Sequence, residues 1–142
     1  MMQSQLNWAR VAEKVGDIKR SLARLKRHGE RTDEEFLTDE NAVLAARYTF
    51  IVLIEAATNI AVHIATRQLH EAPTSYADSF FIMADNGLLD EELADHLGEM
   101  CGFRSLLVHG YDRIDDTRML AIIREDLGDL ELFLDAVTRL RS

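Results

Sequence analysis

The chain has 142 residues, of which 47% are hydrophobic and 29% charged, so it is long and apolar enough to form one compact domain. One proline, seven glycines and a single cysteine exclude a disulfide-built scaffold, a collagen-like chain and a low-complexity polar tract. The scarcity of glycine and proline leaves long uninterrupted stretches, which favours helices over many short strands. We therefore expect residues 1–142 to form a single all-α domain.

Charge is distributed unevenly along the chain. The net charge of −9 argues against broad, non-specific binding of nucleic acid. Residues 10–31, however, contain eight lysines and arginines and only three acids, which gives them a local net charge of +5. This basic segment is either a solvated helix face or a surface for RNA or for an acidic partner.

No segment of the sequence predicts a signal peptide or a membrane span. Residues 1–7 lack both the basic and the apolar region of a signal peptide. The most apolar stretch, Phe50–Ala65, includes Glu55, Asn59 and His63, and therefore predicts a core helix. A cytoplasmic protein without membrane contact is the expectation.

The N-terminal part of the chain predicts two helices in succession. Apolar residues from Trp8 to Leu25 recur in alternating steps of three and four, the period of an amphipathic helix. This first helix is expected to end near Gly29, which can serve as its C-cap. The segment Thr32–Glu35 has the pattern of a capping box and predicts that a helix starts again there.

A long second helix is predicted from Phe36 or Asn41 to Gln68, before Pro73 breaks the chain. Apolar residues occupy most of its circumference, so we expect it to be the central, buried helix. Further helices are predicted at residues 75–87, 90–110 and 115–137, the last as one continuous helix. The sequence as a whole predicts a single bundle of four or five helices.

The residues between Met100 and Tyr111 offer the best candidates for chemistry. The sequence has no phosphate-binding glycine loop, no HExxH zinc motif and no GxSxG nucleophile motif. Arg104, His109 and Tyr111 stand among apolar neighbours, and on a helix His109 would lie about 140° around the axis from Arg104. Gly110 can end the helix and free Tyr111 to turn. A plain helix end, in which Arg104 pairs with an acid, is the alternative.

Glu55 is a second candidate, because a carboxylate on a buried helix stripe is costly unless it is paired. It is either part of a structural ion pair or at the edge of the stripe, or else it orients Arg104 or His109 at a cleft. Asn59 and His63 follow on the same line of the helix and would border that cleft.

Arg104, His109 and Tyr111 together resemble the RX4HXY signature of the HepT-like branch of the HEPN (higher eukaryote and prokaryote nucleotide-binding) superfamily. Residues 54–64 look like the long central helix of that family, and the similarity extends over residues 48–134. The family often has asparagine after the arginine. Here Ser105 takes that place and supports the cleft, since its hydroxyl can still donate and accept a hydrogen bond.

The resemblance implies a homodimeric, metal-independent toxin ribonuclease without a cofactor. It further implies a MntA-like nucleotidyltransferase antitoxin that silences the toxin by attaching AMP to Tyr111. The residues are consistent with this chemistry, because histidine titrates near neutrality and arginine offers a rigid fork of donors to phosphate. His109 is assigned as general acid or base and Arg104 as the group that stabilises the developing charge on RNA.

A non-enzymatic role is the competing interpretation. In it, the chain is a helical adaptor that binds a nucleotidyltransferase or a nucleotide without cleaving RNA. The acidic net charge favours the adaptor, whereas the intact set of Arg104, His109 and Tyr111 favours the ribonuclease.

Overall fold

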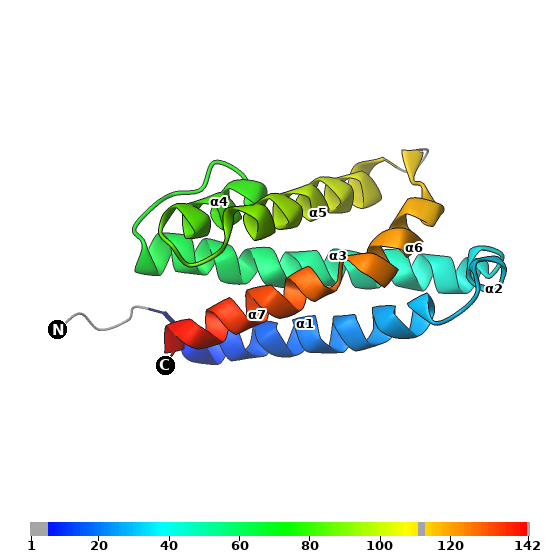
Figure 1. The fold of residues 1–142 in the computed structure, drawn as a ribbon, viewed down its shortest axis with the longest axis horizontal. Coiled ribbons are helices and arrows are strands. Elements are labelled where there is room, and N and C mark those ends of the chain that lie inside the picture. The colour runs from blue at the N-terminus through cyan, green and yellow to red at the C-terminus, as the bar shows by residue number, and fades with distance from the viewer. Residues whose placement is uncertain (1–5, 111–112, 142) are drawn as a thin grey trace.

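The computed structural model describes residues 6–110 and 113–141, and the regular structure within these residues is entirely helical. The expected all-α class is therefore confirmed. In the described residues, seven α-helices and one π-helical turn follow one another along the chain (Figure 1). They are α1 (Trp8–Gly29), α2 (Asp33–Leu37), α3 (Glu40–His63), η1 (Ile64–Gln68), α4 (Tyr76–Asp85), α5 (Glu91–His109), α6 (Asp116–Glu125) and α7 (Gly128–Arg141).

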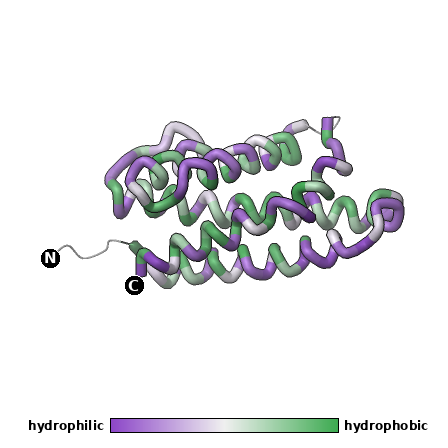
Figure 2. The backbone as a smooth tube through the Cα atoms, in the orientation of Figure 1, coloured by the Kyte–Doolittle hydropathy of each residue, from purple (hydrophilic) through white to green (hydrophobic). Residues whose placement is uncertain are grey.

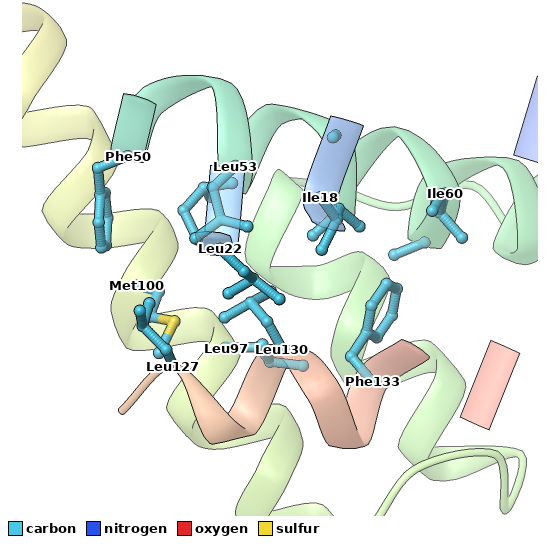
Figure 3. Packing of buried hydrophobic residues seen from close by; sticks show 14 of the residues in the cluster. Ile18, Leu22, Phe50, Leu53, Ile60, Leu97, Met100, Leu127, Leu130 and Phe133 are labelled. Atoms are coloured by element: carbon cyan, nitrogen blue, oxygen red, sulfur yellow. The ribbon is translucent and has the colours of Figure 1, made fainter. Parts of the chain in front are cut away.

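The long helices pack around α3. α1 and α3 run side by side in opposite directions, and α4 and α5 lie on the other side of α3 (Figure 1). Hydrophobic residues recur among hydrophilic ones from turn to turn of α1, as in an amphipathic helix (Figure 2). Apolar side chains from α1, α3, α5 and the C-terminal part of the chain fill the space between them (Figure 3). They include Ile18, Leu22, Phe50, Leu53, Ile60, Leu97, Met100, Leu127, Leu130 and Phe133.

Local capping places the turn between α1 and α3. The Thr32 hydroxyl accepts a hydrogen bond from the Glu35 N–H, and the Glu35 carboxylate accepts one from the Thr32 N–H, so the predicted capping box is confirmed. It opens only the five residues of α2. The Asp39 carboxylate then accepts from the Ala42 N–H, and the long helix begins at Glu40, close to the later of the two expected starts.

Gly29 does not act as the expected C-cap, and that prediction is wrong. It is the last residue of α1, and Glu30 caps the helix in a right-handed conformation. A Cβ atom on Gly29 would lie 3.1 Å from Cγ2 of Ile123, so the glycine instead allows α6 to approach the end of α1. Arg124 secures this contact by donating hydrogen bonds to the Gly29 and Arg31 carbonyl oxygens.

The expectation that α3 is buried around most of its circumference is only partly met. Leu44, Tyr48, Glu55 and Asn59 form an exposed strip, because the neighbouring helices leave one side of α3 uncovered. Within the described residues, Glu40–Gln68 is the one helix whose length and composition would suffice to cross a membrane. Of the 18 most apolar consecutive residues in this helix, 61% are buried in the bundle, as expected for a core helix.

The C-terminal helix predicted at residues 115–137 is divided in two. α6 ends at Glu125 and α7 begins at Gly128, and the turn between them is closed by the Leu130 N–H donating to the Leu127 carbonyl. The apolar spacing hides this break, because it continues in steps of three and four through the turn. The prediction of one continuous helix is therefore wrong.

Two partly buried histidines make the stability of the bundle depend on pH. Burial, together with nearby arginines, lowers the pKa of both His28 and His63 from the ordinary value of 6.5. His63 also accepts a hydrogen bond from the Asn7 backbone N–H at its Nε2 atom, 2.9 Å away, which only the neutral ring can do. Between the lowered pKa values and 6.5, these two histidines therefore bind more protons in the unfolded chain than in the folded one.

We expect the free energy of unfolding to fall as the pH drops through 6.5 toward the lowered pKa of the folded state. Urea midpoints measured at about pH 7.5 and about pH 6 test this. The variant His63→Gln, which removes one of the two rings whose pKa is lowered, is expected to show a smaller difference. A midpoint that stays constant or rises on acidification would contradict the prediction.

Candidate functional site

Arg104 and Glu55 form an ion pair between α5 and α3. Nη2 of Arg104 donates to Oε1 of Glu55 at 2.5 Å. The Arg104 side chain is 18% exposed and the Glu55 side chain 48% exposed, so the pair lies where the bundle meets solvent. Glu55 is therefore at an edge of α3 rather than in its buried stripe. Glu55 is thus both paired and at an edge, as the structural interpretation expected, and its partner is Arg104. That it orients Arg104 for chemistry stays a prediction.

Tyr76 completes the surroundings of the Arg104 guanidinium. It is the first residue of α4, it is 57% exposed, and its ring centroid lies 5.7 Å from Cζ of Arg104. Nε of Arg104 is buried and has no hydrogen-bond partner in the described residues. No motif or spacing singled out Tyr76, because its contact with Arg104 depends on how α4 lies against α5.

His109 lies at the C-terminal end of α5 and is exposed. It lies five positions after Arg104, which places it about 140° around the axis and about 7.5 Å further along. No hydrogen bond joins the two side chains in the described part of the protein. The structure thus presents both residues on one helix, but it does not aim them at a common point within one copy of the chain.

Gly110 ends α5 as predicted, and its N–H donates to the Leu106 carbonyl at 2.7 Å. A Cβ atom at Gly110 would approach that carbonyl oxygen to 3.0 Å, so a larger residue would displace the end of the helix. Tyr111, the predicted site of modification, lies outside the described residues. Its position relative to His109 stays a prediction.

The remaining candidates divide between the site and the rest of the bundle. Asn59 is exposed one turn beyond Glu55, and its Nδ2 donates to the Glu55 carbonyl at 2.8 Å. Ser105 is exposed next to Arg104. His63 is not at the site, because it binds the backbone of Asn7 at the start of α1.

The described residues contain neither a metal-binding cluster nor a reactive thiol. No group of three or more histidine, cysteine or carboxylate side chains in them is placed to hold a metal ion. Burial raises the pKa of the Cys101 thiol to about 11, so this cysteine is protonated and a poor nucleophile. His96 contacts carboxylates of Asp129 and Glu92 at 3.4 and 4.0 Å, as an ordinary surface cluster does.

The fold is the helical bundle that the resemblance to HEPN proteins implied, and Arg104 and His109 lie on one long helix of it. A profile of the family described as Ribonuclease HepT-like matches residues 18–137. The chain belongs to this family, and the resemblance inferred from RX4HXY is confirmed.

Individual relatives agree with this assignment. The chain is 28% identical over 130 residues to the mRNA nuclease HepT of Shewanella oneidensis, which covers 89% of this chain and 95% of the relative. A solved structure of a tri-AMPylated Shewanella oneidensis HEPN toxin in complex with an MNT antitoxin matches with a TM-score of 0.85 at 28% identity, covering 92% of this chain and 97% of that one. The Bacillus subtilis cytosolic protein YutE, of unknown function, shares the fold, with a TM-score of 0.84 at 20% identity over 97% of this chain and 92% of its own.

Proposed function

We propose that this chain is the toxin of a toxin–antitoxin pair and cleaves RNA without a metal ion. The match of residues 18–137 to the Ribonuclease HepT-like family carries this proposal, since it includes both Arg104 and His109. RNA, the substrate, brings its own nucleophile in the 2′-hydroxyl. The cytoplasm, where RNA is plentiful, is the proposed site of action.

In the proposed reaction the 2′-oxygen attacks the adjacent phosphorus and the bond from phosphorus to the 5′-oxygen breaks. One proton leaves the 2′-hydroxyl and one joins the departing 5′-oxygen, so the strand ends are a 2′,3′-cyclic phosphate and a 5′-hydroxyl. His109 transfers protons in this exchange. Arg104 donates hydrogen bonds to the non-bridging oxygens, where negative charge develops. Glu55 engages Nη2 of Arg104, and no protein hydrogen bond in the described residues engages Nη1.

The separation of Arg104 and His109 around α5 supports a homodimer. Two copies related by a two-fold axis would bring two such sets to one shared cleft. Light scattering at micromolar concentration measures the oligomeric state, and a strictly monomeric chain would contradict this part of the proposal. The second partner is a MntA-like nucleotidyltransferase antitoxin, which the solved complex of the relative with an MNT antitoxin supports.

The purified chain, incubated with RNA and with EDTA, tests the ribonuclease. We expect cleavage at an unchanged rate in EDTA, with fragments that carry 2′,3′-cyclic phosphates as read by phosphatase treatment and mass spectrometry. Inhibition by EDTA that a divalent ion reverses would contradict the metal-independent mechanism. A chain that binds the nucleotidyltransferase but leaves RNA intact would favour the adaptor instead.

Glu55 is expected to act by positioning Arg104. Glu55→Ala removes the 2.5 Å contact that holds the guanidinium, and we expect kcat to fall by about tenfold with little change in KM. Glu55→Gln is the matched control, because its amide oxygen can still accept the hydrogen bond and should restore part of kcat. A rise in RNA affinity in Glu55→Gln, with kcat unchanged, would show that Glu55 merely competes with the substrate.

A further inference from the structure

A basic pocket lies on the α1–α3 side of the bundle, away from the Arg104–Glu55 pair. Its volume is about 510 Å³ and it is open to solvent. α1 and α3 each contribute three residues to its lining. They are Arg24, Arg27, His28, Ala45, Tyr48 and Thr49.

The charge in this pocket is uncompensated. No carboxylate lines it, whereas Glu99 and Asp129 line one other pocket of the bundle and Glu131 a second. Arg24 and Arg27 make no hydrogen bond or ion pair in the described residues. Two fixed positive charges therefore face solvent in a chain whose net charge is −9.

Unlike Arg24 and Arg27, the neighbouring basic residues Lys26 and Arg31 form ion pairs. Lys26 pairs with Glu131 of α7 at 2.5 Å, and Arg31 pairs with Asp39 at 3.0 Å. Their charges are compensated within the fold. Much of the basic segment of the sequence is thus engaged structurally, and the solvent-facing positive charge of the pocket comes from Arg24 and Arg27.

Tyr48 gives the pocket an aromatic surface. Its side chain is 68% exposed, which is unusual for an aromatic residue on a central helix. Thr49 offers no free donor, because its hydroxyl already donates to the Ala45 carbonyl at 2.9 Å. Charged arginines beside an open aromatic ring match single-stranded nucleic acid, whose phosphates bind the arginines while a base stacks on the ring.

One residue of the pocket, Tyr48, lies on the same exposed strip of α3 as Glu55. Tyr48 precedes Glu55 by two helical turns, about 10 Å along the axis. α3 and α5 run in opposite directions (Figure 1), so His109 is displaced from Arg104 in the same direction as Tyr48 from Glu55. The end of the site that carries His109 is therefore the end nearest the pocket.

We propose that this pocket is an accessory subsite for the RNA substrate. Arg24 and Arg27 each bind a backbone phosphate of a single strand, and the ring of Tyr48 stacks on a neighbouring base. The subsite holds the strand on one side of the cleavage position, so it contributes to RNA affinity and not to proton transfer. This inference rests on the proposed ribonuclease function.

Fluorescence anisotropy with a short labelled single-stranded RNA tests the subsite. The His109→Ala chain serves as the background, so that the RNA is not cut during the measurement. We expect the double change Arg24→Gln and Arg27→Gln to weaken binding by at least tenfold and to reduce the slope of log Kd against log salt by about 1.4, the value for two lost phosphate contacts on a single strand. Tyr48→Ala is expected to weaken binding by about tenfold, and Tyr48→Phe, which keeps the stacking ring, to change it little.

The matched control is Arg139→Gln, which removes an exposed arginine from α7. If the double variant binds RNA as tightly as Arg139→Gln does, the subsite is wrong. It is also wrong if the double variant keeps its RNA affinity but loses the nucleotidyltransferase or dissociates into monomers, since the surface is then a protein interface. A parent chain that neither binds nor cleaves RNA would refute the proposed function itself, which is a separate result.

Discussion

Replacing His109 with alanine is expected to slow RNA cleavage by two to four orders of magnitude, roughly the contribution of general acid–base catalysis. His109 is exposed at the end of α5, so its loss should change the free energy of unfolding by about 0.5 kcal/mol or less. Single-turnover cleavage rates and thermal unfolding followed by circular dichroism separate the two effects. A catalytic loss without a loss of fold is the expected outcome.

His96→Ala is the matched control for this experiment, because it removes another partly exposed histidine from the same helix. It should cleave RNA at the parental rate. Arg104→Lys adds a second comparison, since it keeps the positive charge but loses the planar donor fork and should remain strongly impaired. If His109→Ala cleaves as fast as the parent, His109 is not the group that moves the proton.

Modification of Tyr111 is expected to reduce toxicity to background. When the chain is produced together with its nucleotidyltransferase, the phenol oxygen should attack the α-phosphorus of ATP, lose its proton and release pyrophosphate. The new phosphodiester places negative charge beyond Gly110, where it competes with RNA phosphate for Arg104 and fills space that a base would need. Mass spectrometry should find increments of AMP on the peptide that contains Tyr111.

Tyr111→Phe distinguishes modification from simple binding. It should carry no AMP and remain toxic in the presence of the partner. A partner that neutralises an unmodified parent chain, or the phenylalanine variant, would show that inhibition proceeds by complex formation alone. In that case the tyrosine of RX4HXY has another role in this protein.

The sequence predicted those parts of the fold that depend on local chemistry. The capping box of Thr32 and Glu35 and the helix end at Gly110 follow from residues a few positions apart. The packing role of Gly29 did not follow, because it depends on how α6 lies against α1. The break at residues 126–127 did not follow either, because the apolar spacing continues through it. The exposed strip on α3 was missed for a related reason: Leu44 and Tyr48 are apolar enough to predict burial, and only the arrangement of neighbouring helices leaves them uncovered.

The candidate site was predictable where a motif or an energetic conflict marked it. A carboxylate on an apolar helix needs a partner, and this indicated that Glu55 is paired or lies at an edge, with Arg104 or His109 as candidate neighbours. The partner in the structure is Arg104, 49 positions away. Neither a motif nor an energetic conflict marked Tyr76, since an aromatic residue at the start of a helix has many structural uses. His63 shared the helical line of Asn59, yet it lies two turns from Glu55 and binds the start of α1.

The position of Phe133 determines which mutations should abolish the fold, and with it the toxicity, of this protein. Its ring is fully buried against Phe80 of α4, and Leu130 fills the adjoining space between the long helices (Figure 3). A stop codon anywhere between His109 and Phe133 would leave the whole RX4H motif in the product but open the centre of the bundle to water. We therefore expect cells that survive production of the active toxin to carry premature stop codons well beyond the catalytic motif, in addition to substitutions within it.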